Sequence, residues 1–190
     1  MMIGVDSFRF ELRNEGGETP IPGGLGLRSA EGVMFKPDLI DVMVKATFSG
    51  FIVELHVISI DDLTYMTNPI SGAWQTFEVG LSPVAFFDPA TGINLILESL
   101  LEPALGDDTV VDGTPAHRIK GTLPARAAQF IAGGYLEGAV LDAELLIGKD
   151  DSLLRRVELR GVLKEGEPAG IVRVLNFSEF GRLFEIEAPI

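Results

Sequence analysis

Hydrophobic and polar residues alternate most regularly along residues 40–58, in two runs on either side of Ser49-Gly50. Such alternation is typical of strands with one buried face, and a two-residue connection that contains glycine is typical of a β-hairpin. A two-residue turn pairs Phe48 with Phe51 and so fixes the register of the whole hairpin. In that register one face is entirely apolar, and we predict that it forms a wall of the domain: Val42, Val44, Ala46, Phe48, Phe51, Val53, Leu55 and Val57.

The opposite face of the same hairpin is mixed. The predicted register places Lys45 opposite Glu54, and Met43 opposite His56. The opposite charges of Lys45 and Glu54 attract each other across the two strands. Because charged side chains are mostly found at the protein surface, this face is expected to meet solvent.

Alternation also predicts strands along most of the remaining chain. Phe8, Phe10 and Leu12 share one face of a strand over residues 7–13. Further strands are predicted near residues 30–35, 63–67, 74–77, 109–111, 116–123, 141–147, 153–163 and 171–177. Residues 19–26, with two prolines and three glycines, are predicted to form a loop. We expect about ten strands in mostly antiparallel hairpins.

Two segments in the middle of the chain show helical periodicity. After Asp88 and Pro89, which can cap and begin a helix, apolar residues recur at i, i+3, i+4, i+7 and i+8. These residues are Ile93, Ile96, Leu97, Leu100 and Leu101. A shorter helix, predicted between Pro124 and Gly133, has three apolar residues on one side: Ala127, Phe130 and Ile131. Strands that flank two helices predict one α+β domain over residues 1–190.

Composition narrows the classes of function. Hydrophobic residues make up 46% of the chain, and the mean hydropathy is +0.29. No stretch approaches the roughly 18 apolar residues that a membrane span needs, so we expect the apolar surplus to be folded inward. The formal net charge of −13 repels polyphosphate backbones and anionic membrane surfaces, and we therefore expect no nucleic-acid binding.

Residues that could carry out catalysis are few and scattered. The chain has no cysteine and no G-x-S-x-G motif, and only His56 and His117 offer an imidazole. We expect both histidines to be ordinary strand residues. Aspartate pairs fall in predicted turns, where solvated charges are expected rather than metal ligands: Asp61-Asp62, Asp107-Asp108 and Asp150-Asp151. Residues 22–27 are rich in glycine but lack the Lys-Ser/Thr of a phosphate-binding loop. We therefore predict no enzymatic activity, no metal site and no cofactor.

Periodicity alone leaves the use of the apolar surplus open. Its simplest explanation is an ordinary, filled hydrophobic core. The patterns by themselves favour that explanation over a cavity for a ligand.

Several segments, taken in order, resemble one known family. They are Ser7-Phe8-Arg9-Phe10, Ala30-Glu31-Gly32, residues 58–69 with Gly72-Ala73-Trp74, Phe87-Asp88-Pro89, Asp112-Gly113-Thr114, Leu153-Leu154-Arg155-Arg156-Val157 and Phe177-Ser178-Glu179-Phe180-Gly181. In order and spacing they resemble the LppX/LprG-type lipoproteins of mycobacteria and their relatives, whose domain has the LolA-like fold. The resemblance covers nearly all of the chain.

The resemblance implies a curved antiparallel half-barrel sheet with helices covering its concave face, as a single lipid-binding domain. It further implies binding and transport of long-chain acylated lipids or glycolipids in the cell envelope, outside the cytoplasm, with a membrane transporter as an expected partner. On this interpretation the hairpin face is one wall of an apolar cavity. The helices then supply a lid: Ile93, Ile96, Leu97, Leu100, Phe130 and Ile131.

Family members are tethered through a lipidated cysteine that follows a signal peptide. This chain has no cysteine. A membrane tether is therefore expected only in a full-length form of the protein.

A second function fits the same fold. An envelope lipoprotein of this kind could act as a sensor that recognises the acylated or unfolded end of another protein. A carrier predicts lipid that co-purifies with the protein, whereas a sensor predicts an empty groove and a defined protein partner.

Overall fold

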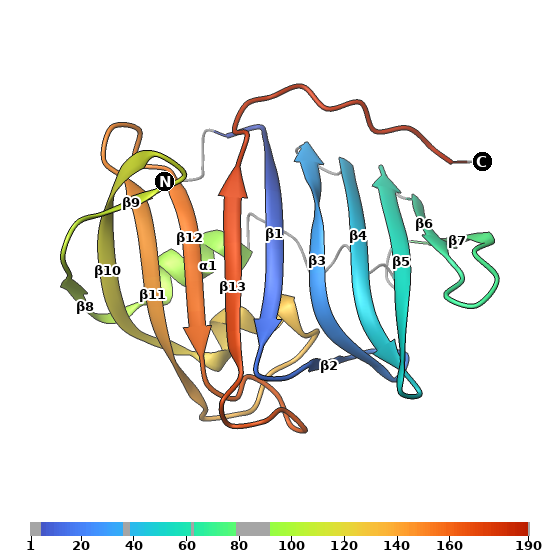
Figure 1. Ribbon diagram of the computed structural model, residues 1–190, viewed down its shortest axis with the longest axis horizontal. Coiled ribbons are helices and arrows are strands. Elements are labelled where there is room, and N and C mark those ends of the chain that lie inside the picture. The colour runs from blue at the N-terminus through green and yellow to red at the C-terminus, as the bar shows by residue number, and fades with distance from the viewer. Residues whose placement is uncertain (1–4, 36–38, 62, 79–91, 190) are drawn as a thin grey trace.

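The computed structural model describes residues 5–35, 39–61, 63–78 and 92–189. In these residues thirteen strands form one antiparallel sheet, accompanied by two short helices (Figure 1). The strands are β1 (Ser7–Glu15), β2 (Thr19–Ile21), β3 (Leu25–Phe35), β4 (Leu39–Phe48), β5 (Phe51–Ile60), β6 (Leu63–Thr67), β7 (Trp74–Glu78), β8 (Leu101–Leu105), β9 (Thr109–Val111), β10 (Thr114–Pro124), β11 (Val140–Gly148), β12 (Leu154–Arg160) and β13 (Val172–Ser178). The helices are α1 (Gly92–Ser99) and the 3-10 helix η3 (Ala125–Ile131).

The two halves of the chain meet in the middle of the sheet. The strand order is β7-β6-β5-β4-β3-β1-β13-β12-β11-β10-β8, with β2 paired to β3 and β9 paired to β10. The first strand, β1, therefore lies between β3 and the last strand, β13. The end strands β7 and β8 do not pair with each other, so the sheet is open, and the predicted antiparallel half-barrel is confirmed.

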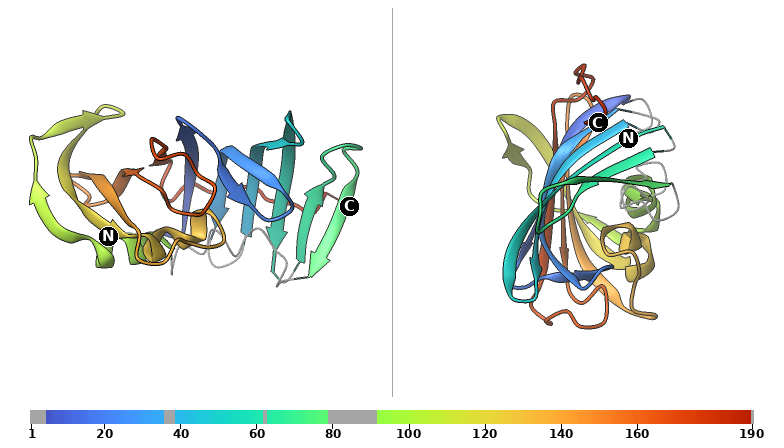
Figure 2. Two further views of the ribbon diagram at one scale, coloured as in Figure 1. Left: turned by 90° about the horizontal axis from the view of Figure 1, so that it is seen from below. Right: turned by 90° about the vertical axis from the view of Figure 1, so that its right-hand side faces the viewer.

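Both helices lie on the same side of the bent sheet (Figure 2). We call the face of the sheet toward them the inner face. In β1, Phe8, Phe10 and Leu12 are buried in a core that also contains residues of α1 and η3, while Arg9 and Glu11 alternate with them on the outer face. The period of two in the sequence thus decides which side of each strand meets the helices.

The central hairpin has the predicted register. Phe48 is paired with Phe51, and every other predicted pair along β4 and β5 is present. The φ angles of Ser49, 50°, and Gly50, 84°, are both positive, as the favoured two-residue hairpin turn requires.

Residues 19–26 are not the plain loop that their prolines and glycines predict. β2 pairs with the start of β3 in this segment, so that Thr19 lies opposite Leu27 and Ile21 lies opposite Leu25. Proline is compatible with β2 because this strand pairs on one side only.

The first helix is shorter than its periodicity predicts. α1 ends at Ser99, and Leu101 is the first residue of β8. Pro103 explains this end, because its ring would clash with the carbonyl group of Ser99 in a continued helix and it has no N–H to donate. The assignment of Leu101 to the helical stripe is therefore wrong. The predicted helix start, at Asp88 and Pro89, lies outside the described residues.

The second helix is present as η3, which buries Ala127, Phe130 and Ile131 as predicted. The strand predicted over residues 153–163 ends earlier, because Gly161 takes a φ of 117° that leaves the extended conformation. Among the described residues, neither helix is long and apolar enough to cross a membrane.

Candidate functional site

The predicted hairpin wall lies on the inner face of the sheet. Its buried residues are Val42, Val44, Ala46, Leu55 and Val57. Phe48 and Val53 are half-buried. Phe51 is 75% exposed. The middle of the hairpin therefore belongs to the core, and its turn end reaches solvent.

The predicted lid residues meet the same core. Those buried in it are Ile93, Ile96, Phe130 and Ile131. Leu97 and Leu100 are half-buried and pack against it. The two helices also contact each other. The wall and lid residues thus belong to one buried core, in which the helices pack on each other and on β10. Contact of these residues with a ligand stays a prediction.

A row of paired apolar residues extends the wall far beyond the hairpin. We call it the apolar row. It crosses neighbouring strands from β5 to β10 through register partners: Leu55, Val44, Ala30, Leu12, Leu175, Val157, Leu145 and Ile119. All of them except the half-buried Ile119 are buried. Because neighbouring strands lie about 4.8 Å apart, the seven steps of the row measure roughly 33 Å, close to the thickness of about 30 Å of a bilayer's hydrocarbon core.

Sequence reasoning identified only part of this surface. It named Val44 and Leu55 as wall residues, and alternation in β1 indicated that Leu12 is buried. It gave no signal that β1 pairs with β13, the contact that joins the two halves of the row.

Exposure of the inner face increases toward the hairpin turn. Along β5 the exposed fraction is 1% at Val57 and 3% at Leu55. Val53 is half-buried, and Phe51 is largely exposed. The inner face is thus covered in its middle and open at the end marked by Ser49.

One ion pair on the inner side of β13 is fully buried. The side chains of Arg173 and Glu167 pair with both 0% exposed. Arg173 Nη1 donates to the carbonyl oxygen of Gly161 at 3.0 Å. Glu167 Oε2 accepts from the backbone N–H groups of Leu163 at 2.6 Å and Lys164 at 3.1 Å. These bonds hold the connection between β12 and β13 against the sheet. Sequence reasoning missed the pair, although alternation in β13 already places Arg173 on the inner side.

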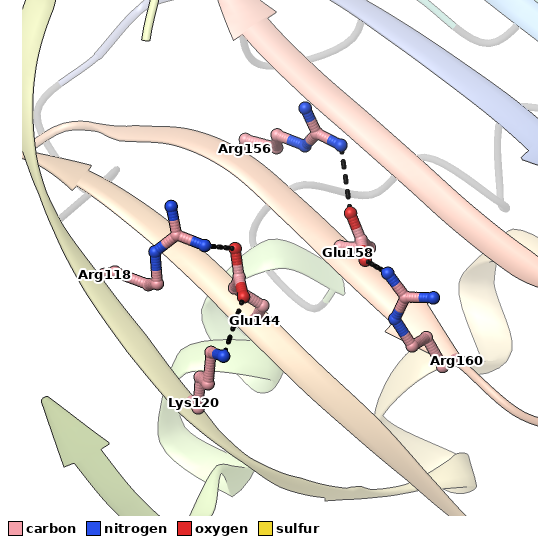
Figure 3. A network of polar contacts seen from close by, with 6 residues as sticks. All are labelled: Arg118, Lys120, Glu144, Arg156, Glu158 and Arg160. Carbon is pink, nitrogen blue, oxygen red and sulfur yellow. Dashed lines mark hydrogen bonds and ion pairs between the residues drawn. The ribbon is translucent and has the colours of Figure 1, made fainter. Parts of the chain in front are cut away.

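The outer face of the C-terminal strands is charged (Figure 3). Each of two glutamates lies between two basic residues: Glu144 between Arg118 and Lys120, and Glu158 between Arg156 and Arg160. Glu144 is 2.9 Å from Arg118 and 3.6 Å from Lys120. The two glutamates are 25% and 14% exposed, whereas their basic partners are 32–61% exposed, so the network presents a charged surface to solvent on the outer face.

Both histidines lie in strands. His56 Nε2 is 2.7 Å from Asp41 Oδ1, and its ring centroid is 5.0 Å from that of Trp74. His117 Nδ1 is 3.2 Å from Asp108 Oδ1. These contacts are those of polar strand residues near the surface. His56 lies on the outer side of β5, whereas His117 lies on the side of β10 that also carries Ile119, with 48% of its side chain exposed.

The described members of the aspartate pairs lie in turns or connections between strands. The hydrogen bond from Lys149 holds the pKa of Asp108 below its ordinary value. Asp151 pairs with Arg155, and Asp62 lies outside the described residues. In the part of the chain that the structure describes, no group of three or more His, Cys, Asp or Glu residues could hold a metal ion.

Comparison with known proteins agrees with this geometry. The fold is similar to the crystal structure of LprF from Mycobacterium bovis, with a TM-score of 0.73 and 16% sequence identity over 98% of this chain and 90% of that chain. It is also similar to the lipoprotein LppX from Mycobacterium tuberculosis, with a TM-score of 0.67 and 17% identity over 98% of this chain and 92% of that chain. No curated protein gives a significant match. Residues 2–182 match the LppX_LprAFG lipoprotein family, and the chain therefore belongs to that family.

Proposed function

We propose that this protein binds the acyl chains of a lipid or glycolipid between the inner face of the sheet and the helices α1 and η3, and that it carries this lipid within the cell envelope. The apolar row is the observation that supports the proposal most, because it provides one continuous apolar surface across strands β5 to β10. Its length of roughly 33 Å is enough for two acyl chains from one leaflet placed end to end. Membership of a lipoprotein family supports a location outside the cytoplasm.

The energy of transfer explains why a carrier needs such a surface. Each methylene group hidden from water contributes about 0.8 kcal/mol, so two chains of roughly 15 carbons need on the order of 20 kcal/mol of protection outside a bilayer. An apolar protein surface supplies that protection, and no charged side chain is needed to hold the acyl chains. Because a membrane is equally apolar, exchange of the lipid between protein and membrane is then nearly balanced.

The lid must move for a ligand to reach the middle of the wall. Val42 and Val57 are covered in the described structure. The large helix side chains buried in the core are Ile93, Ile96, Phe130 and Ile131. Each contributes about 1.5–3 kcal/mol, so together they contribute about 6–12 kcal/mol. Burial of two acyl chains, worth on the order of 20 kcal/mol, exceeds the loss of these contacts. We therefore propose that the lipid replaces α1 and η3 against the wall, and that the predicted wall and lid residues line it on its two sides.

The proposal includes no catalytic step. The protein would receive its lipid from a membrane, with a membrane transporter as a partner, and would release it unchanged. Specificity for a head group would rest on polar groups outside the apolar row.

Mass spectrometry of bound lipid tests the proposal. The protein is purified without detergent from cells with a lipid-rich envelope, denatured, and extracted with organic solvent. About one acylated lipid for each protein molecule is expected. A protein that carries no lipid and instead co-purifies with one defined protein would refute the carrier and favour the sensor function.

A further inference from the structure

Two neighbouring hairpin ends lack charged residues altogether. Residues 19–27 form the β2–β3 hairpin end and residues 46–53 form the β4–β5 hairpin end, and neither segment contains Asp, Glu, Lys or Arg. Register pairs join the two: Leu25 lies opposite Phe48, and Leu27 lies opposite Ala46. Both hairpin ends therefore lie at the same end of the strands, at the bottom of the sheet in Figure 1.

These hairpin ends present a group of exposed apolar side chains. Phe51 and Ile52 are 75% and 65% exposed. Pro22 is exposed, and Leu25 and Phe48 are half-buried beside them. We call these residues the apolar tip. Ile52 points to the opposite side of β5 from Phe51, so both sides of this hairpin end are apolar. Single exposed apolar residues are common on soluble proteins, whereas several gathered at one end of a sheet indicate a binding surface.

The charged residues that border the two uncharged segments neutralise one another. Glu18 and Arg28 flank the first segment and pair at 3.7 Å. Lys45 and Glu54 flank the second and pair at 3.4 Å. The apolar tip thus has a border with no net charge, although the chain as a whole carries −13.

The apolar tip continues the inner face of the sheet. Phe51 shares its side of β5 with Val53 and Leu55, which belong to the predicted wall. Phe48 shares its side of β4 with Val44 in the same way. An apolar surface therefore runs without a charged side chain from the tip to the apolar row.

We propose that the apolar tip inserts into the surface of a lipid bilayer and connects the inner face to it. Side chains of this kind partition into the boundary between head groups and acyl chains, about 5–10 Å deep. The uncharged border favours uncharged or zwitterionic head groups, because the net charge of the rest of the protein repels anionic ones. The inference rests on the proposed carrier function, since it names the membrane contact through which that carrier takes up or releases lipid.

Flotation with phosphatidylcholine vesicles tests the inference. The full chain binds these vesicles, and Phe51→Ser weakens the partition coefficient roughly tenfold, because the lost burial of one phenyl ring corresponds to at least that factor. The double variant with Ile52→Ser weakens it roughly a hundredfold. Vesicles that also contain phosphatidylglycerol bind less of the protein at low salt, and added salt restores the binding.

Matched substitutions control for the loss of any exposed apolar residue. Leu105, 77% exposed in β8, and Ile70, 84% exposed in the turn after β6, lie outside the apolar tip. Leu105→Ser and Ile70→Ser are expected to change the partition by less than about twofold. In Phe51→Trp, vesicles shift the tryptophan emission to shorter wavelength relative to the unsubstituted protein, and in Ile70→Trp they do not.

Three results would overturn the inference. The first is a chain that does not bind the vesicles, and the second is equal binding by the tip variants and the controls. The third is a dimer in the absence of vesicles that Phe51→Ser converts to monomer, since a second copy then covers the tip. Bound lipid is measured separately, so that the two proposals can fail independently. If the protein carries lipid but Phe51→Ser leaves its vesicle binding unchanged, only the membrane-inserting role of the apolar tip is refuted. If the protein carries no lipid but its vesicle binding depends on the tip, only the carrier function is refuted.

Discussion

Val44→Trp separates a ligand-binding wall from a permanently filled core. Val44 lies on the inner face between Ala30 of β3 and Leu55 of β5, and all three are buried. If α1 and η3 leave the wall to admit an acyl chain, they also admit an indole ring. The variant then keeps most of its stability, while the ring occupies space that the lipid needs, and bound lipid falls by more than half.

A core that never opens predicts a larger loss of stability for Val44→Trp. Overpacking of a filled core costs roughly 1–3 kcal/mol or more. In a domain of this size each kcal/mol lowers the melting temperature by about 2–4 °C, so the loss would be roughly 2–12 °C. Urea midpoints and thermal melting give the stability, and mass spectrometry of extracted lipid gives the load.

The control for this variant is Glu54→Ala on the outer face of the same hairpin. It removes an exposed partner of Lys45, 3.4 Å away, and should change stability by less than about 1 kcal/mol with an unchanged lipid load. A Val44→Trp protein that is strongly destabilised and still carries a full load of lipid would refute the assignment of this face to the binding wall.

Three further predictions concern stability and ionisation. Glu167→Gln leaves the Arg173 guanidinium buried without its counterion and should cost about 3–5 kcal/mol in urea unfolding, part of which Arg173→Met in the same chain restores; an unchanged midpoint would contradict the burial of the pair. The pKa of Asp108, lowered chiefly by the hydrogen bond from Lys149, should return toward 3.8 in Lys149→Met when followed by NMR. Because this pKa is lowered by folding, the stabilisation it brings is present above the ordinary value and is lost as the pH falls through the lowered one. EDTA should leave the melting temperature unchanged, and a fall of several degrees would reveal a structural metal.

The register of the central hairpin could be predicted because two independent features agree. The Ser49-Gly50 turn fixes which residues pair, and alternation fixes which of them face the core. Val42 and Val57 satisfy both conditions, and the structure pairs them. Agreement between turn chemistry and periodicity is therefore what makes a local prediction reliable.

The end of α1 could not be predicted from periodicity, because Leu100 and Leu101 happen to continue the helical spacing. The deciding residue is Pro103, which acts on the carbonyl group four residues earlier and is itself part of β8. The loop prediction for residues 19–26 was wrong for a related reason. Their glycines and prolines indicate a loop when read alone, and only the neighbouring strand β3 provides the hydrogen-bonding edge that makes β2 a strand.

The apolar row depends on pairing between the ends of the chain, which no local pattern contains. Within β1 the residues Phe8, Phe10 and Leu12 share a face, and nothing in residues 7–13 distinguishes one from another. In the sheet they differ, because Leu12 is the one whose partners are Ala30 on one side and Leu175 on the other. It therefore joins the N-terminal half of the row to the C-terminal half. Local alternation decides which side chains face inward, and the contact between β1 and β13 decides that these side chains form a surface long enough for a lipid.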